Sequence, residues 1–399
     1  MVRHAFTVAA LGSLAIARAA PAQTTSAPLA SSLRVYSEAE TDGPLWQPGG
    51  VLVVGGTLWV LDTGNDRIVV VQAGGPARSI GREGSGPGEF RWPVVLEHTP
   101  DGHVAVWDRS LRRVTIFDRT GEVVESRLFD VTEPGLDPWV VLPTAAGYLA
   151  LFNTSMNALN PPDPRGEAPG ALLRVGRDGA RERLSTFPPY GVATVRLVRG
   201  DTTRFVWVSA FSDAPAFLDF TPACGGVYLA STGGRSVRWE IFDPAGERLT
   251  TFRDDSMAGV PVQRREWEAY LASLGRNRRV FEQVLEPPER HAPVQDLRLA
   301  TTGYVLGRTT PRRHRGEHAN WRIWPLVRAK VSTTSPGAAA GRAGGVPTPG
   351  TPVDVLLPNR FAPYEMRADT IWGIELDDLG VPTLRAYRVP FALPPACGP

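Results

Sequence analysis

Two segments of the chain follow the same order of strands and turns. They are Leu96–Asp130, LEHTPDGHVAVWDRSLRRVTIFDRTGEVVESRLFD, and Leu218–Asp254, LDFTPACGGVYLASTGGRSVRWEIFDPAGERLTTFRD. Both run through Leu and an acid, Thr-Pro, a Gly turn, an apolar strand, Ile-Phe-Asp, a Gly turn and a last apolar strand. This alternation is typical of half-buried antiparallel strands. Each segment is therefore predicted to be a unit of four strands.

Four weaker copies bring the number of units to six. They are Val51–Ile80, Val140–Phe187, Leu297–Val327 and Phe361–Val389. The last copy stops after its third strand, and a strand-like segment, Leu33–Tyr36, precedes the first copy. We therefore predict an all-β, six-bladed β-propeller in which the N-terminal strand closes the last blade and leaves no free sheet edge. A pair of β-sandwiches is the alternative, but it would not need six matching units.

A loop rich in glycine and proline separates the first two units. Gly81–Phe90 reads GREGSGPGEF, in which five of ten residues are Gly or Pro, so it is predicted to be a tight crossover loop. Together with Asp62–Ile68, DTGNDRI, it resembles the NHL-repeat type of six-bladed β-propeller, in an exported bacterial form. The resemblance implies binding of proteins, peptides, glycans or RNA, whereas a few relatives are lyases or metal-dependent lactonases. Such a fold constrains function only loosely.

The N-terminus has the features of a secretory leader. A basic start at Arg3 and His4 precedes an apolar run over residues 5–17, and Ala-Pro-Ala follows at 20–22. Residues 1–23 are predicted to be a signal peptide, because the apolar run is too short to span a bilayer and Arg18 interrupts it. We expect a protein exported to the periplasm or the medium, with no membrane span, in which residues 24–399 form a single propeller domain.

Charge and cysteine content narrow the possible partners. Removing Arg3 and Arg18 with the leader lowers the formal net charge from +2 to zero, so no nucleic-acid partner is expected. We expect a monomer.

The two cysteines, Cys224 and Cys397, form either one disulfide that ties the C-terminal tail to the fourth unit or two unrelated thiols. The sequence leaves both alternatives open.

Two insertions interrupt the repeat. Val262–Leu285 has apolar residues at helical spacing on both sides of Gly275, which predicts a helical hairpin between blades four and five. It is either a packed decoration, the interpretation we favour, or a mobile lid. Ser332–Pro352 is rich in Gly, Pro, Ala, Ser and Thr, which predicts a disordered loop over residues 332–352 inside the domain.

A basic loop in the fifth unit contains two histidines at metal-ligand spacing. His314 and His318 are four residues apart, but Pro311 and the flanking arginines argue against a helix and against a bound cation. The same loop provides Arg312, which could contact an acidic or aromatic ligand together with Trp321. A solvated loop is the simpler interpretation.

A polar set follows the second strand of the first unit. Asp62, Asn65 and Arg67 occupy a tight turn, where Asp and Asn side chains usually bind backbone N–H groups. Asp108 holds the same place in the second unit. This repetition favours a structural role over ligand contact.

Aligning the innermost strands on their turn glycines places one residue of each blade around the central channel. The ring so predicted consists of Val51, Glu97, Leu142, Asp219 (or Phe220), Arg298 and Tyr364. Metal-dependent propeller enzymes hold Ca²⁺ or Zn²⁺ with several carboxylates in this place, and Glu97 and Asp219 are the candidates here. Because Arg298 adjoins Asp219 in the ring, we favour structural ion pairs over catalysis.

The chain lacks the motifs of common enzyme classes, since it has no GxSxG, no phosphate-binding loop and no dinucleotide-binding fingerprint. We therefore predict a binding protein without a cofactor, whose unknown protein, peptide or glycan ligand contacts the end loops and the channel mouth. The candidate ligand-binding residues are Arg298, Arg312, Trp321, Trp267 and Tyr364, with Trp139 and Tyr190 as further anchors. The alternative is a metal-dependent, lactonase-like hydrolase or a lyase that uses Glu97 and Asp219.

Overall fold

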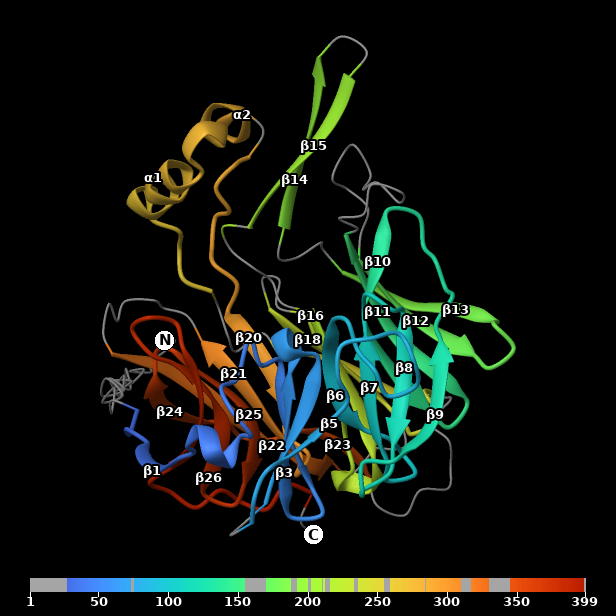
Figure 1. Cartoon of the computed structure of the whole chain (residues 1–399). Helices are drawn as coiled ribbons and strands as arrows, with labels where there is room; N and C mark the ends of the chain where they lie inside the picture. Colours follow the sequence, from blue (N-terminus) through green and yellow to red (C-terminus); the bar gives the residue numbers. More distant parts are fainter. Residues whose placement is uncertain are drawn as a thin grey trace, which may run out of the picture.

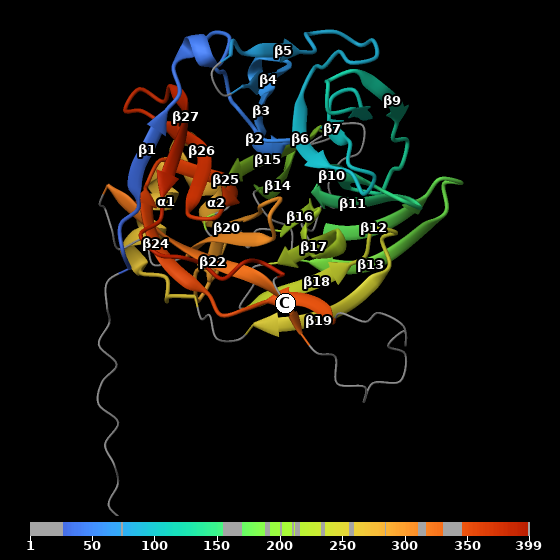
Figure 2. The ribbon, with the colours of Figure 1, turned by 90° about the horizontal axis from the view of Figure 1, so that it is seen from below.

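Six antiparallel sheets surround a central channel, so the prediction of an all-β, six-bladed propeller is confirmed (Figures 1 and 2). The computed structural model describes residues 27–397 apart from 73–74, 155–169, 188–191, 200–201, 210, 212–215, 233–235, 255–258, 284, 310–316 and 330–344. The predicted leader therefore lies outside the described residues. In every blade the first strand is innermost and its start faces the same end of the ring, which we call the entry end.

The first three blades follow each other without interruption. Blade 1 consists of β2 (Gly50–Val54), β3 (Thr57–Asp62), β4 (Arg67–Val71) and β5 (Arg78–Ile80). Blade 2 consists of β6 (Pro93–His98), β7 (Val104–Asp108), β8 (Arg113–Phe117) and β9 (Val123–Leu128). Blade 3 consists of β10 (Leu136–Thr144), β11 (Gly147–Thr154), β12 (Gly170–Gly176) and β13 (Arg181–Phe187).

The remaining blades include strands from distant parts of the sequence. Blade 4 consists of β16 (Ala216–Thr221), β17 (Val227–Thr232), β18 (Val237–Phe242) and β19 (Arg248–Asp254). Blade 5 consists of β20 (Val294–Leu299), β21 (Tyr304–Thr309), β22 (His318–Ala329) and β24 (Val353–Pro358), and β23 (Val346–Pro349) pairs with the far part of β22. Blade 6 consists of β25 (Phe361–Arg367), β26 (Thr370–Leu376), β27 (Pro382–Arg388) and β1 (Ser31–Val35).

The ring closes through its N-terminal strand, as predicted. β1 pairs antiparallel with β27, and the register runs from Ser31 opposite Arg388 to Val35 opposite Arg385. The last blade thus takes its outer strand from the other end of the described chain. This pairing removes the free edge that an incomplete sixth blade would expose.

The core lies between neighbouring blades. Between blades 1 and 2, for example, Trp59, Phe90 and Phe117 are fully buried in one apolar cluster. Gly81 at the start of the crossover loop has a φ of +81°, and a Cβ there would lie 2.3 Å from the Phe90 ring. The loop therefore requires glycine at this position, both for its backbone conformation and for the packing of Phe90.

Insertions rise at the entry end of the ring, where Figure 1 shows them above the blades. The predicted helical hairpin is present between blades 4 and 5 as α1 (Arg264–Ser273) and α2 (Arg278–Glu282). A β-hairpin formed by β14 (Val192–Arg199) and β15 (Thr202–Ser209) stands between blades 3 and 4 and was not predicted. Its sequence matches no part of the repeat, so the repeat pattern did not predict this hairpin.

The predicted disordered loop over residues 332–352 is wrong in its last part. Val346–Pro349 forms β23, whose backbone pairs with Leu326–Ala329 of β22. The low-complexity composition suggested disorder, but the end of β22, which extends beyond its pairing with β24, provides ladder partners for this segment. The part of the loop before residue 345 lies outside the described residues.

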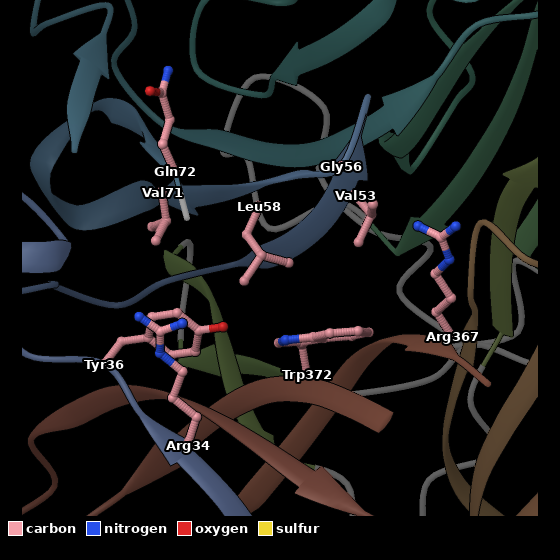
Figure 3. Close-up of a pocket in the computed structure, with 9 residues that line it drawn as sticks. All are labelled: Arg34, Tyr36, Val53, Gly56, Leu58, Val71, Gln72, Arg367 and Trp372. Carbon is pink, nitrogen blue, oxygen red and sulfur yellow. The ribbon is translucent and has the colours of Figure 1, made fainter. Parts of the chain in front are cut away.

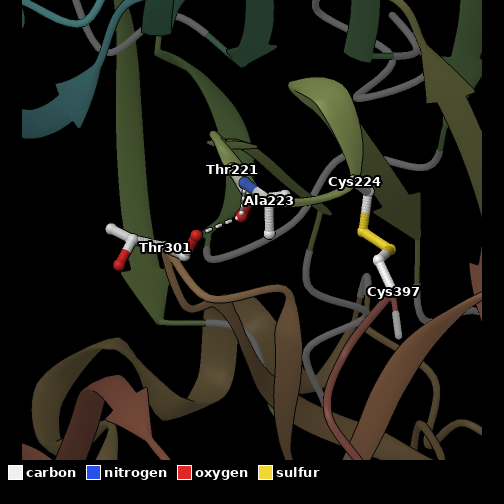
Figure 4. Close-up of a disulfide and its surroundings, with 5 residues drawn as sticks. All are labelled: Thr221, Ala223, Cys224, Thr301 and Cys397. Carbon is white, nitrogen blue, oxygen red and sulfur yellow. Dashed lines mark hydrogen bonds between the residues drawn. A yellow bond between two sulfur atoms is a disulfide. The ribbon is translucent and has the colours of Figure 1, made fainter. Parts of the chain in front are cut away.

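The two cysteines form a disulfide (Figure 4). The Cα atoms of Cys224 and Cys397 are 5.2 Å apart, and the bond joins positions 173 residues apart in sequence. Cys224 follows β16 of blade 4, beside Thr221, whose hydroxyl donates a hydrogen bond to the carbonyl oxygen of Thr301 over 2.6 Å. The disulfide therefore anchors the C-terminal tail where blades 4 and 5 are already joined.

Buried aspartates at the ends of two second strands organise the turns, as predicted. Asp62 accepts hydrogen bonds from the Asn65 side chain and from Arg67 Nε, over 2.8 and 2.9 Å. Asp108 accepts from the backbone N–H of Arg91 and Leu111, over 2.7 and 2.8 Å. The structural interpretation of this repeated position is therefore confirmed.

Candidate functional site

The innermost strands of all six blades surround a cavity of about 350 Å³ that opens at the entry end. The structure brings together the four polar residues that the sequence placed around the channel, and three more residues with polar side-chain atoms line the cavity. The seven are Glu97, Asp219, Arg298 and Tyr364, with Trp139, Asp296 and Glu365. The predicted ring residue of blade 3, Leu142, is instead almost completely buried behind the channel wall.

Glu97, on β6, has backbone hydrogen bonds from His98 and Phe220 but, in the described part of the chain, one carboxyl oxygen without a partner. Its Oε2 is buried and has no hydrogen-bond partner among the described residues. Burial, followed by the negative charges of Asp219 and Glu365, raises the pKa of Glu97 well above its usual value. Glu97 therefore has an unused capacity to bind a hydrogen-bond donor or a cationic group in the channel.

Asp219, on β16, is held by the neighbouring blade. Its Oδ2 accepts a hydrogen bond from the backbone N–H of Leu299 over 3.0 Å. Burial raises the pKa of Asp219 to about 6, although the positive charge of Arg298 and the Leu299 amide oppose the rise. This carboxyl therefore changes its protonation near neutral pH and can donate or accept a hydrogen bond.

Glu365, on β25, is the channel carboxyl that sequence reasoning missed. Its Oε1 accepts hydrogen bonds from the backbone N–H groups of Thr301 and Met366, over 3.0 and 2.9 Å. Burial still raises the pKa of Glu365 to about 7, because these bonds offset only part of the cost of removing the charge from water. Its proximity to the predicted Tyr364 was the signal that could have found it.

Arg298 provides the positive charge of the channel. Its Nη1 lies 3.0 Å from Asp296 Oδ1 and donates a hydrogen bond over 2.8 Å to the carbonyl oxygen of Leu297. Its guanidinium carbon lies 5.2 Å from the centre of the Tyr364 ring. Burial would lower the pKa of Arg298, but the neighbouring Asp296, Tyr364 and Asp219 outweigh burial and raise it. The guanidinium is therefore charged and fixed in direction before any ligand binds.

β-bulges determine which aromatic residues reach the channel. The pairing of β10 with β11 shifts between Pro138 and Val140, so Trp139 is the extra residue. The pairing of β25 with β26 shifts in the same way around Tyr364. A bulge re-aims its extra side chain, and both of these aromatic residues line the cavity.

The other predicted ligand-binding residues do not belong to the channel. Trp321 is 1% exposed in the core cluster shared by blades 5 and 6, so its prediction as an exposed anchor was wrong. Trp321 lies on β22. The strand that pairs with β22 here, β24, follows the low-complexity segment in the sequence. Arg312, His314 and Tyr190 lie outside the described residues.

Trp267 is half-buried at the base of the helical insertion. Its ring centre lies 5.3 Å from those of Phe211 and Tyr270, and Phe211 also contacts His291 at 5.4 Å between ring centres. Phe211 follows the β-hairpin insertion in the sequence, so this aromatic cluster joins the helices to the segment after that hairpin. The contacts show that Trp267 packs within this aromatic cluster.

The channel carboxyls do not form a metal-binding group. In the described part of the chain, no three or more His, Cys, Asp or Glu side chains are placed to hold a metal ion. Asp219 is directed to the Leu299 amide and Glu365 to the Thr301 and Met366 amides. The donor set therefore does not fit the cluster of converging oxygens that Ca²⁺ requires or the tetrahedral set typical of Zn²⁺.

A smaller cavity of about 150 Å³ lies between blades 1 and 6 (Figure 3). Leu58 and Trp372 line it, and the guanidinium carbon of Arg34 lies 4.5 Å from the centre of the Tyr36 ring at its edge. Arg34 also pairs with Glu40. This cavity is separate from the channel and has no unpaired buried polar atom in its lining.

The sequence matches no protein-family model and no curated protein. Among solved structures, the chain is similar to a Bacteroides fragilis protein described as exported, with 11% identity, a TM-score of 0.47, and coverage of 91% of this chain and 95% of that chain. It is also similar to virginiamycin B lyase from Staphylococcus aureus, with 9% identity, a TM-score of 0.38, and coverage of 90% and 99%. A luciferin-regenerating enzyme matches with 11% identity, a TM-score of 0.44, and coverage of 93% and 99%. These similarities support no functional assignment.

No described helix is both long enough and apolar enough to cross a bilayer.

Proposed function

We propose that this protein is an exported binding protein of the NHL-repeat type, which takes a ligand or partner at the entry end and into the channel mouth. The observation that carries the proposal is a cavity of about 350 Å³ with a buried carboxyl oxygen of Glu97 that has no hydrogen-bond partner in the described part of the chain. Buried polar atoms are normally hydrogen-bonded, and small-ligand sites combine a concave cavity with a few polar groups.

The lining favours a ligand with many hydroxyl or amide groups. Arg298 donates hydrogen bonds, and Asp219 and Glu365, with pKa values of about 6 and about 7, offer both protonated and ionised oxygens near neutral pH. Because Asp296 partly neutralises Arg298, a simple anion gains little from entering the channel. Glycans and peptides present the required mixture of donors and acceptors.

The test is the substitution Glu97→Gln, measured by calorimetric titration of the mature protein with ligands found on peptide and glycan arrays. Gln keeps the size of the side chain but replaces one carboxyl oxygen with an NH2 group that cannot accept a hydrogen bond, so we expect affinity to fall about tenfold, as for the loss of one hydrogen bond. Glu125→Gln is the matched control, because Glu125 pairs with Arg127 on the outer strand β9, away from the channel. Equal affinities for the wild type and Glu97→Gln would contradict a channel site.

The competing hypothesis is an enzyme, and the raised pKa values of the channel carboxyls are the observation in its favour, since acid–base catalysts share this property. A metal-dependent hydrolase or lyase would contain stoichiometric Ca²⁺ or Zn²⁺ that is lost on Asp219→Ala. Elemental analysis of the purified wild type and this variant distinguishes that enzyme from the binding protein we propose.

A further inference from the structure

Two tryptophans are exposed at the entry end, although five other tryptophans of the described residues are buried in the core. Trp46 is 59% exposed and Trp92 is 41% exposed, whereas Trp59 and Trp107 of the same two blades are fully buried. Each exposed tryptophan lies just before the innermost strand of its blade, β2 or β6. Both rings therefore lie at the end of the propeller where the channel opens.

The repeated aspartates fix the backbone of both exposed tryptophans. Asp62 Oδ1 accepts a hydrogen bond from the N–H of Trp46 over 2.7 Å, and Asp108 Oδ2 accepts from the N–H of Trp92 over 3.2 Å. A Cβ at Gly64 would lie 1.8 Å from Trp46 Cδ1, so the Trp46 ring packs directly against the Gly64 backbone. Rings held in this way lose little conformational entropy when a ligand binds.

Direct contacts connect these tryptophans to the channel mouth. The hydroxyl of Thr63 donates to the carbonyl oxygen of Pro93 over 2.8 Å and joins the turn of blade 1 to the strand that follows Trp92. The N–H of Arg109 donates to the carbonyl oxygen of Trp92 over 3.1 Å, and the Arg109 guanidinium carbon lies 4.7 Å from the centre of the Trp139 ring. Trp139 lines the channel cavity. Trp46, Trp92, Arg109 and Trp139 thus follow one another from blade 1 to blade 3 at the entry end, and we call these four residues the aromatic row.

We propose that the aromatic row binds an oligosaccharide, with one end of the sugar chain at the channel mouth. This inference deepens the proposed function and rests on it. A pyranose ring has an apolar C–H face that can stack on an indole ring, whose face is electron-rich, and a rim of hydroxyls that bind polar side chains. The channel beyond Trp139 offers donors and acceptors for those hydroxyls.

The residues between the rings favour a glycan over a protein partner. Arg91 and Arg109 lie beside Trp92, and Arg91 is exposed. A protein partner would favour a contiguous apolar centre from which charged residues are depleted. Flat aromatic rings separated by hydrogen-bonding groups instead match the alternation of apolar faces and hydroxyl edges along a sugar chain.

The experiment begins with a glycan array probed with the mature, disulfide-bonded protein, followed by titration of the best oligosaccharide with the wild type and variants. We expect Trp46→Ala and Trp92→Ala each to weaken binding about tenfold, the usual effect of losing one stacked ring, and Trp92→Phe to weaken it less. Bound sugar should also protect wild-type tryptophan fluorescence from acrylamide quenching. Val124→Ala, which removes an exposed apolar side chain from the outer strand β9, is the control and should bind like the wild type.

The outcomes separate this inference from the proposed function. If Glu97→Gln weakens sugar binding but the tryptophan variants do not, the channel binds ligand and the aromatic row does not. If the tryptophan variants weaken binding and Glu97→Gln does not, the aromatic row binds sugar and the proposed channel site fails. The inference is overturned if no glycan on the array binds the folded protein, or if only peptides bind through Trp46 and Trp92.

Discussion

Glu365→Gln gives the most direct test of the electrostatics of the channel. Glu365 is 1% exposed, and burial raises its pKa from 4.5 to about 7. The folded protein therefore holds this proton more tightly than the unfolded chain does. The contribution of the protonated Glu365 to the free energy of unfolding is fully present below pH 4.5. It is lost as the pH rises to about 7. At 1.36 kcal/mol for each pH unit, the loss in free energy of unfolding is about 3 kcal/mol.

The Gln variant removes this ionisation and keeps the shape of the side chain. Its Oε1 can still accept the two shorter hydrogen bonds, from the N–H groups of Thr301 and Met366, and only the longer bond from Thr301 to Oε2, at 3.3 Å, is lost. We therefore expect the variant to match the wild type near pH 4.5 and to exceed it by about 3 kcal/mol at pH 8.

Urea unfolding followed by tryptophan fluorescence at pH 4.5, 6 and 8 measures this difference. The wild type is compared with the variant at each pH, and part of the difference comes from Glu97, because the charge of Glu365 raises the pKa of Glu97. Glu125→Gln on the outer strand should show no such dependence. If Glu365→Gln is equal to or less stable than the wild type at pH 8, the Thr301 and Met366 amides stabilise the anion fully and the reasoning from burial fails.

Three further substitutions test the scaffold. Cys397→Ser should lower the free energy of unfolding by up to about 5 kcal/mol, because the disulfide closes a loop of 173 residues; dithiothreitol should match this effect in the wild type and change nothing in the variant. Asp108→Ala should lower the free energy of unfolding, measured with urea, by about 2–4 kcal/mol, because three partly buried backbone amides lose their acceptor. Asp108→Asn should lower it less. Gly81→Ala should lower the melting temperature by several degrees, because the new Cβ meets the Phe90 ring in a left-handed backbone conformation.

The scaffold could be predicted from the sequence because the repeat specifies it. Every blade carries recognisable strands at similar spacing, and an orphan strand at the start with a missing strand at the end predicts closure. The buried aspartates at positions 62 and 108 were recognised as structural for the same reason, since a role that recurs from blade to blade belongs to the fold. Segments without a counterpart in the repeat, such as β14, β15 and β23, could not be found in this way.

Burial of Trp321 could not be predicted because it depends on a strand that is distant in sequence. The β22 strand that carries Trp321 has a neighbour, β24, which returns only after residue 352. From sequence alone, the fifth blade was predicted to end at Val327, so no fourth strand was expected beside β22. Trp321 was therefore predicted to be exposed. The covering strand places Trp321 in the core.

The channel residues are harder to predict from the repeat than the scaffold is, because local interruptions of the repeat determine which side chains line the channel. Innermost strands of blades 2, 3, 5 and 6 shift register near their starts, while those of blades 1 and 4 pair without a shift. Each shift adds one residue and moves the alternation of side chains to the other face beyond it. Alignment on turn glycines found Glu97, Asp219, Arg298 and Tyr364. It missed Trp139, the extra residue at the bulge in β10, and Glu365, which directly follows the bulge at Tyr364. The residues that distinguish this channel from that of another propeller thus lie where the repeat is broken, and variants at the bulges should alter ligand choice more than stability.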